Sequence, residues 1–311
     1  MTLRRLSVPS FAKINWTLKI LGQRSDGYQQ IKTLYQTVDL SEELVFETTS
    51  NRGIEIEVEG RKVAPGEDNL LYQTAELLRQ TTGSQAGIRI KLQKKIPVGA
   101  GLGGGSSNAA LALLALNQLW DCKIGEKELV ELAGQLGSDV PFFLVGGTAL
   151  GWGRGAEVVP LPDLPQEKSL LLLYPHLEIS TREAYALGKW GTYGGTGQLT
   201  REWAEITMRS LLRAMGPEGD GWSFLENDFE DVLFAHYPVL VEAREALKKA
   251  GCERVMVCGS GSTLLGFGSD KQVKEAAAVI TREGIGETFF CRTLSRKHYR
   301  QVLMNSGLLL L

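Results

Sequence analysis

Apolar and polar residues alternate over much of the first 60 residues, a pattern that predicts β-structure. The segments INWTLKIL (14–21) and GIEIEVEG (53–60) show the two-residue period most clearly. Turn-forming residues interrupt the alternation at Ser25-Asp26-Gly27 and at Asn51-Arg52-Gly53. A further short strand, GIRIKL, is predicted at 87–92.

Helical periods appear around this last strand. The pattern predicts a helix that begins near Asp68-Asn69 and runs through LLYQTAELLRQTTG, a second from Ser106 to about Trp120, and a third over GEKELVELAGQLG. The first and third end at glycine, the usual C-terminal stop of a helix. The second contains AALALLALNQLW and is apolar on nearly every side, so we expect it to be buried.

The stretch PLPDLPQEK (160–168) predicts a linker between two halves of the chain. Strands GGTALGWG and AEVVPL precede it, and the apolar strand SLLLLYP follows. The second half continues with helices around 200–215 and 228–250, a β-pair in CERVMVCGSGSTLLGFG, a helix near 270–283 and the strand ETFFCRTL, while GTYGGTG (191–197) is predicted to be a flexible surface insertion. Because strands and helices mix without strict βαβ alternation, the predicted class is α+β, with domains at 1–163 and 164–311.

Composition narrows the class of protein. The 311 residues are 43% hydrophobic and 23% charged with a net charge of −2, which is typical of a globular protein. Basic residues occur in runs no longer than a pair such as Arg4-Arg5, so we do not expect nucleic-acid binding. Four scattered cysteines and three histidines make a Cys/His metal site improbable and favour reduced thiols. No signal-like or membrane-spanning segment is present, so we expect a cytoplasmic protein, or one in the plastid stroma if a transit peptide has been removed.

The segment PVGAGLGGGSSNAA (97–110) holds five glycines followed by two serines. Glycine lacks Cβ, so backbone N–H groups can approach a ligand closely, and a helix beginning at Ser106 would add its unpaired N–H groups and the positive end of its dipole. The hydroxyls of Ser106 and Ser107 would stand where a phosphate sits. We therefore favour a phosphate cradle over a plain strand–helix turn.

Three familiar phosphate sites do not fit this loop. A dinucleotide fold needs an acidic residue at the end of a second strand, whereas Asp121 has the right spacing but ends a helix. A Walker loop needs Gly-Lys-Ser/Thr, and here the glycines run into Gly-Ser-Ser. A protein kinase needs a His-Arg-Asp motif, which the chain lacks.

The segment PVGAGLGGGSSNAALALLALN resembles the signature P-x-x-x-G-L-G-[GS]-[GS]-[AS] of the GHMP small-molecule kinases, a superfamily that includes galactokinase, homoserine kinase and mevalonate kinase. PSFAKINWTLKILGQRSDGYQQIKTL and GSGST stand where the superfamily has its other motifs. The resemblance covers nearly all of residues 8–160 and isolated segments beyond. It implies a two-domain fold, with an N-terminal ribosomal-protein-S5-like domain and a C-terminal ferredoxin-like α+β domain, and it implies ATP with Mg²⁺ as cofactors.

Four motifs point to one branch of the superfamily, whose kinases act in the non-mevalonate isoprenoid pathway. The motifs most similar to that branch are A-K-I-N, R-x-D-G-Y, E-D-N-L and L-G-S-D-V-P-F-F. The substrate of that branch carries a cytidine diphosphate group and is phosphorylated at a 2-hydroxyl. This resemblance implies that Lys13 and Asp139 are catalytic, with Asp139 as general base. By pattern alone, Lys13 and Asn15 would share a solvated strand face, and Asp139 could simply be an N-cap.

The same resemblance implies the binding residues. The nucleotide side comprises Pro97, Gly99, Gly101, Leu102, Gly103, Gly104, Gly105, Ser106, Ser107, Asn69, Leu70 and Lys94. The substrate side comprises Asn15, Tyr28, Gln29, Tyr185, Gly259, Ser260 and Gly261. Tyr28 and Tyr185 match the aromatic pair that sandwiches cytosine, whereas Gln29 replaces the usual histidine; its amide can both donate and accept hydrogen bonds.

Two other functions stay open. A homoserine- or mevalonate-type kinase would share the fold, although a small aliphatic substrate needs no aromatic sandwich. A non-catalytic sensor on the same fold would have no need of Lys13 and Asp139 together.

Overall fold

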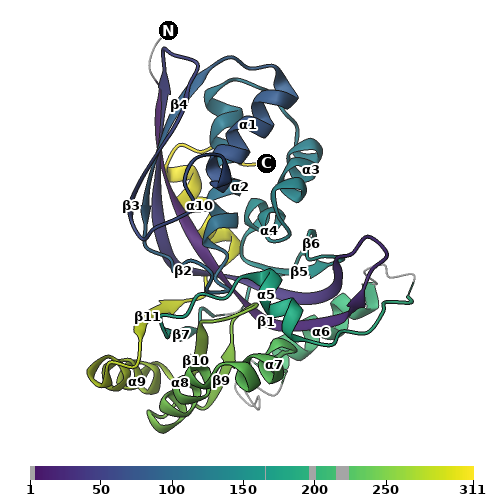
Figure 1. The fold of residues 1–311 in the computed structure, drawn as a ribbon, viewed down its shortest axis with the longest axis vertical. Coiled ribbons are helices and arrows are strands. Elements are labelled where there is room, and N and C mark those ends of the chain that lie inside the picture. Colours follow the sequence, from purple (N-terminus) through teal and green to yellow (C-terminus); the bar gives the residue numbers. More distant parts are fainter. Residues whose placement is uncertain (1–3, 165, 196–200, 215–223) are drawn as a thin grey trace.

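The computed structural model describes residues 4–164, 166–195, 201–214 and 224–311, arranged around two β-sheets (Figure 1). The larger sheet has the order β3-β4-β2-β1-β8, with β5 on β2 and β6 on β5. The smaller sheet has the order β11-β7-β10-β9. The strands of the larger sheet are β1 (Arg5–Gln23), β2 (Gln29–Thr49), β3 (Ile54–Gly60), β4 (Gly87–Lys94), β5 (Thr148–Trp152), β6 (Glu157–Pro160) and β8 (Glu226–Asn227).

The long antiparallel hairpin β1–β2 is the backbone of the larger sheet. One part of β2 pairs with β4 and the other with β5, so the sheet divides along this strand. Register shifts in β1 between Phe11 and Lys13, and again between Asn15 and Thr17, mark bulges. Bulges increase local twist and redirect side chains. They bracket the residues Lys13 and Asn15.

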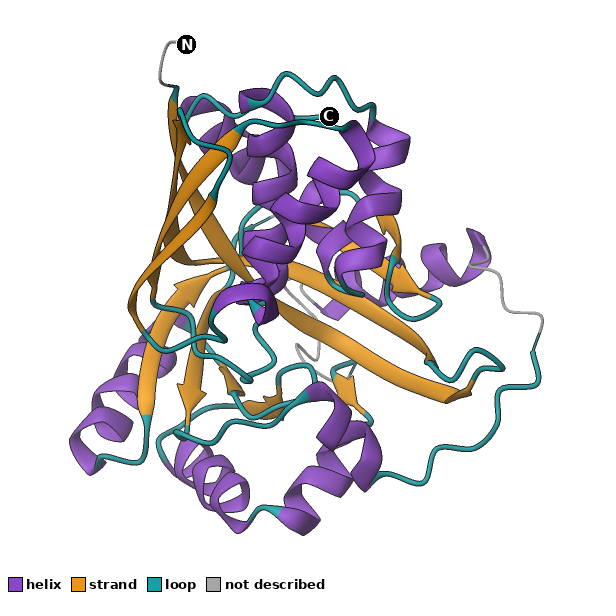
Figure 2. Ribbon diagram, turned by 45° about the horizontal axis from the view of Figure 1, so that its top comes forward, coloured by secondary structure: helices purple, strands orange, loops and turns teal. Residues whose placement is uncertain are grey.

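Helices α1 (Leu70–Thr82), α2 (Gly104–Leu119), α3 (Glu126–Leu136), α4 (Val140–Val145) and α10 (Arg296–Asn305) gather on one face of the larger sheet (Figures 1 and 2). Helix α2 lies among them, and its apolar positions are buried as the sequence predicts. Helix α1 begins where the Asn69 side chain accepts from the Leu71 N–H, and it ends at Gly83, whose φ of 70° suits glycine.

The smaller sheet consists of β7 (Ser169–Tyr174), β9 (Arg254–Val257), β10 (Leu264–Phe267) and β11 (Glu287–Arg292). Helices α8 (Pro238–Lys249) and α9 (Asp270–Glu283) pack against it. Nearby are α5 (Thr181–Leu187), α6 (Arg201–Ala214) and α7 (Phe229–His236). The short 3₁₀ turn η1 (Gly66–Asp68) directly precedes α1 and contacts it. Helix α9 starts with a reciprocal capping box between Ser269 and Gln272.

These elements confirm the α+β class and most of the predicted segments, with three differences. The predicted helix at 228–250 is two helices, because Tyr237 is extended and Pro238 begins the next helix. Helix α2 begins at Gly104 instead of Ser106, since Gly103 in the left-handed region provides its N-cap. Helices α4, α5 and α10 were not predicted. Of the predicted insertion at 191–197, residues 196 and 197 lie outside the described ranges.

The end of the chain returns to the first sheet. Residues 161–164 and 166–168 form neither helix nor strand, as expected of a linker. Beyond it, however, Leu294, Leu303 and Leu308 join the apolar core beneath α2. The division at 163/164 therefore stays a prediction, with the last helix packed on the first body. Among the described helices, none has the length and apolar character needed to cross a bilayer.

Tyr299 fastens α10 to this core. Its hydroxyl donates to the Phe143 carbonyl of α4 at 2.6 Å, and its ring lies 5.6 Å from that of Phe11. A Cβ at Gly146 would lie 2.1 Å from the ring, so only glycine admits this packing. Through these contacts Tyr299 of the C-terminal helix α10 acts as a clamp on α4, the helix that follows Asp139.

Substitutions at Tyr299 test this clamp. We expect Tyr299→Phe to lower the free energy of unfolding by about 1–3 kcal/mol, because the buried Phe143 carbonyl loses its donor. Tyr299→Ala should cost about 3–5 kcal/mol, because it also leaves a cavity. Urea unfolding measures both, with the half-exposed Met304→Ala on the same helix as control. A cost for Tyr299→Ala no larger than that of the control would contradict the clamp.

Candidate active site

A cavity of about 1,040 Å³ lies where β1, the glycine loop, the start of α4 and the first residues of α5 meet. Its volume is at the upper end of the ~300–1,000 Å³ of small-molecule sites. Most of the residues predicted for binding and catalysis line it: Lys13, Asn15, Tyr28, Gln29, Asn69, Leu70, Lys94, Pro97, Gly99, Gly101, Leu102, Gly103, Gly104, Gly105, Ser106, Asp139, Tyr185, Gly259 and Ser260. Segments far apart in the sequence thus converge on one hollow.

The glycine loop is held in a conformation that suits glycine alone. Gly99, Gly101 and Gly103 have φ values of 60°, 76° and 69°. A Cβ at Gly101 would lie 1.9 Å from the Cys258 carbonyl oxygen, and one at Gly103 would lie 2.9 Å from the Lys13 side chain. No side chain caps the first turn of α2. The loop therefore presents a helix N-terminus, the local structure that binds phosphate.

The two serines of the loop lie in different surroundings. Ser106 lines the cavity. Ser107 is fully buried, and its hydroxyl accepts a hydrogen bond from Ser10 at 2.8 Å. Successive helical residues point about 100° apart, so the two hydroxyls cannot share one direction. We expected both hydroxyls to face an anion, but only that of Ser106 lies at the cavity.

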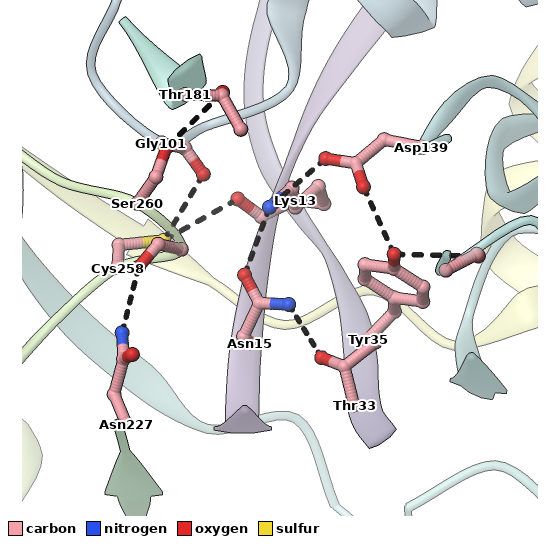
Figure 3. A network of polar contacts seen from close by, with 12 residues as sticks. Lys13, Asn15, Thr33, Tyr35, Gly101, Asp139, Thr181, Asn227, Cys258 and Ser260 are labelled. Atoms are coloured by element: carbon pink, nitrogen blue, oxygen red, sulfur yellow. Dashed lines mark hydrogen bonds and ion pairs between the residues drawn. The ribbon is translucent and has the colours of Figure 1, made fainter. Parts of the chain in front are cut away.

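Lys13 is the charged centre of the cavity (Figure 3). Its ammonium lies 3.2 Å from Asp139 Oδ2 and donates to Asn15 Oδ1 at 2.8 Å. Asn15 Nδ2 in turn donates to Thr33 Oγ1 at 2.6 Å. The Lys13 side chain is 4% exposed, whereas that of Asp139 is 29% exposed. The solvated strand face that the alternation alone suggested is therefore wrong: Lys13 and Asn15 face a buried polar chain.

Asp139 occupies the N-cap position of α4, but its side chain makes no capping hydrogen bond. Its Oδ1 instead accepts from the Tyr35 hydroxyl at 2.9 Å, and its Oδ2 faces Lys13. The simple N-cap role consequently does not account for this carboxylate. Tyr35 was not among the predicted residues, because its contact with Asp139 spans 104 positions in sequence.

A second buried ion pair lies behind the glycine loop. Lys94 donates to both oxygens of Glu42, at 2.7 and 2.8 Å, and Asn108 Nδ2 also donates to Glu42. The backbone N–H groups of Lys95 and Ile96 complete the shell. Burial lowers the pKa of Lys94, although the Glu42 carboxylate opposes the shift. Lys94 therefore lines the cavity with its ammonium already paired with Glu42.

The predicted base-binding residues all line this cavity. Tyr185 packs edge-on against Phe229 at 4.9 Å between ring centres. Tyr28 is 51% exposed, and the Arg154 guanidinium lies 4.9 Å over its ring. Gln29 Oε1 is buried and has no hydrogen-bond partner among the described residues. Such an atom is ready to accept from a ligand.

The turn after β9 closes the cavity on another side. Gly259 and Ser260 line it, whereas Gly261 does not. Asn227 holds this turn by donating to the Gly259 carbonyl at 2.7 Å, and the Ser260 hydroxyl lies 3.2 Å from that of Thr181. Within the described ranges, no group of three or more His, Cys, Asp or Glu side chains is placed to hold a metal ion.

Comparison with known proteins gives two family matches. The family described as GHMP kinases N terminal domain matches residues 69–147, and GHMP kinases C terminal matches residues 205–286. A protein of Pelotomaculum thermopropionicum named 4-diphosphocytidyl-2-C-methyl-D-erythritol kinase is 39% identical, over 91% of this chain and 96% of its own. A protein of the same name from Moorella thermoacetica is 37% identical, over 93% and 99%.

Solved structures agree. A crystal structure of 4-(cytidine 5′-diphospho)-2C-methyl-D-erythritol kinase is similar with a TM-score of 0.74 and 31% identity, and the match covers 93% of this chain and 99% of that one. A homoserine kinase of Cytophaga hutchinsonii has a TM-score of 0.64 at 20% identity, with coverage of 93% and 95%. The second likeness concerns the fold alone.

The Glu42–Lys94 pair gives a stability test. Glu42→Gln should lower the free energy of unfolding by about 3–5 kcal/mol, because it leaves the Lys94 ammonium buried without its counter-charge. The double variant Glu42→Gln/Lys94→Met should recover much of this loss, since no buried charge remains. Urea unfolding of both, with the exposed neighbour Glu43→Gln as control, measures the coupling. Equal values for Glu42→Gln and Glu43→Gln would show that the pair does not stabilise the fold.

Proposed function

The chain belongs to the GHMP kinase family, and from this premise we propose that it phosphorylates the 2-hydroxyl of 4-diphosphocytidyl-2-C-methyl-D-erythritol, with ATP as phosphoryl donor. The family and the kinase relatives make it an ATP-dependent small-molecule kinase. One arrangement carries the choice of reaction: the glycine loop and the Lys13–Asp139 pair line the same cavity. The relatives of that name, similar over nearly the whole chain, support the substrate.

Phosphoryl transfer asks chiefly for positioning and for stabilisation of charge. In the proposed reaction, the N–H groups of the glycine loop and the start of α2 bind the triphosphate. The substrate hydroxyl loses its proton to Asp139 as its oxygen bonds to the γ-phosphorus, and the bond from that phosphorus to the β,γ-bridging oxygen breaks to release ADP. Lys13, 3.2 Å from Asp139, places a positive charge beside the carboxylate that takes this proton.

Mg²⁺ belongs to this proposal as an ion that arrives on ATP. Mg²⁺ is commonly bound by one or two carboxylates together with substrate phosphates, and it supplies neutralisation of phosphate charge. The cavity that the glycine loop lines also contains the Asp139 carboxylate, a ligand type that suits this mode. Lys13 and the first turn of α2 contribute the positive charge that the protein itself provides.

The substrate side of the cavity favours a nucleoside over a small aliphatic alcohol. Tyr28 and Tyr185 both line it, and stacking of a base on an aromatic ring contributes about 1–3 kcal/mol. The unpartnered Gln29 Oε1 offers an acceptor to the amino group of cytosine, in place of the histidine expected from the family. Homoserine and mevalonate have no ring to occupy this place. A sensor without activity would not require Asp139 to be held by both the ion pair with Lys13 and the hydrogen bond from Tyr35.

The partner implied is thus a small molecule with a cytidine diphosphate group, without nucleic acid or membrane. A cytoplasmic location suits this role, because the relatives compared above come from bacteria.

A substrate panel tests the proposal directly. ADP release should be rapid with 4-diphosphocytidyl-2-C-methyl-D-erythritol and at background with mevalonate, homoserine and galactose, because only the first presents a base to Tyr28 and Tyr185. Turnover of another alcohol in place of the cytidyl compound would overturn the substrate, and turnover of none would overturn the specific activity.

The role of Asp139 has its own test. Asp139→Asn should reduce kcat at least about a hundredfold, since an amide cannot take the substrate proton. ATP should still bind, because the glycine loop is unchanged; calorimetric titration with ATP checks this. The exposed Asp231→Asn on α7 is the matched control. Near-normal turnover by Asp139→Asn would refute the general-base assignment.

A further inference from the structure

The two oxygens of Asp139 have separate partners on adjacent strands. Lys13 of β1 faces Oδ2 at 3.2 Å, and the Tyr35 hydroxyl of β2 donates to Oδ1 at 2.9 Å (Figure 3). We propose that Tyr35 is a positioning residue for the transfer, which fixes the Asp139 carboxylate toward the substrate hydroxyl. This inference rests on the proposed role of Asp139 as general base.

The site is built to hold the Tyr35 ring in place. The residue is 1% exposed, and its ring packs on that of Phe142 in α4 with 4.8 Å between centres. A Cβ at Gly151 would lie 2.4 Å from a ring carbon, and one at Gly155 would lie 2.7 Å from the hydroxyl oxygen. Larger residues at these two positions would displace the ring. The hydroxyl is therefore delivered to Asp139 by packing, at a fixed place.

The hydroxyl of Tyr35 faces Asp139 as a donor. Burial, followed by the negative charge of Asp139, raises the pKa of the Tyr35 hydroxyl well above its ordinary value. The phenol thus keeps its proton at neutral pH. Its alternative acceptor, the Gly155 carbonyl, is 3.4 Å away, against 2.9 Å for Asp139 Oδ1. The shorter contact goes to the charged acceptor, which forms the stronger hydrogen bond.

The other groups that face Asp139 leave Tyr35 and Lys13 as its direct partners. Tyr185 of α5 and Cys258 of the turn after β9 both interact electrostatically with this carboxylate. Burial raises the pKa of Tyr185, and burial raises the pKa of the Cys258 thiol to about 11. Both groups are neutral at pH 7. Lys13 therefore supplies the one positive charge among these neighbours, and Tyr35 supplies the directional hydrogen bond.

One consequence follows for the carboxylate. The hydrogen bond from Tyr35 restricts rotation of the Asp139 carboxylate, which matters because general-base catalysis depends on a hydrogen-bond distance to the substrate hydroxyl. Each oxygen retains a further lone pair for the incoming proton.

Tyr35→Phe tests the proposal, because it removes the hydroxyl and keeps the ring that packs on Phe142. With the cytidyl substrate, kcat should fall about tenfold, the usual value of a hydrogen bond to a charged group. KM for ATP should stay unchanged.

Tyr237→Phe is the matched control. It removes another tyrosine hydroxyl that donates to a carboxylate, here that of Glu183 at 2.7 Å and not that of Asp139. It should leave kcat with the cytidyl substrate and KM for ATP in place. A Tyr35→Phe enzyme with wild-type kcat would overturn the proposal, and so would one whose thermal midpoint alone has fallen.

A substrate-free measurement separates this inference from the proposed reaction. Carbon-13 NMR of the aspartate carboxyls, with the Asp139 signal assigned by its loss in Asp139→Asn, should show the Asp139 signal displaced in Tyr35→Phe and unmoved in Tyr237→Phe. An Asp139 signal that Tyr35→Phe leaves in place would overturn the role of Tyr35 whatever the enzyme phosphorylates. A displaced signal in a protein that does not turn over the cytidyl compound would support the contact and refute only the substrate.

Discussion

The close approach of the glycine loop to its neighbours is the constraint on which the site depends. Without a Cβ, Gly101 comes against the Cys258 carbonyl and Gly103 against Lys13. Backbone hydrogen bonds then join the loop to three distant segments: the Lys13 N–H donates to Leu102, that of Ile179 to Gly99, and that of Thr263 to Ala100. The first strand, the segment before α5 and the turn after β9 meet at this loop. Packing alone therefore requires glycine at these two positions, whether or not the loop binds phosphate.

Two buried lysines flank the loop, and their acidic partners differ in a way that separates support from chemistry. Glu42 is fully buried and accepts from Lys94, Asn108 and two backbone N–H groups, so its lone pairs are committed. Asp139 is paired with Lys13 yet remains 29% exposed to the cavity, with room for one more partner. A carboxylate saturated with donors stabilises a structure, and one left partly open can take a proton.

The sequence predicts most of the fold because most elements have a recognisable local pattern. Apolar and polar residues alternate in β1 and β2, glycines end α1 and α3, and α2 is apolar on nearly every side. The short helix α4 escaped prediction, since six residues are too few for a period to show. Alternation alone predicts a solvated face for Lys13, because it identifies a face but not what covers it; only the family resemblance indicates a catalytic role. One signal was available for Glu42: it alternates with Leu44 and Phe46 on the buried face of β2, where a charge requires a partner. Tyr35 carried no such signal.

The position of the Asp139 carboxylate follows from rigid elements and not from a loop. Asn15 and Tyr35 are opposite each other in the β1–β2 register, so the hairpin brings the Lys13–Asn15 chain and the Tyr35 hydroxyl to one side of the sheet. Helix α4 carries the carboxylate, and two aromatic contacts fix that helix: Phe142 against Tyr35, and the Phe143 carbonyl beneath Tyr299. Sites built on strands and packed helices hold their geometry better than sites on loops. The last helix of the chain, far from the cavity in sequence, is therefore part of what orients the base.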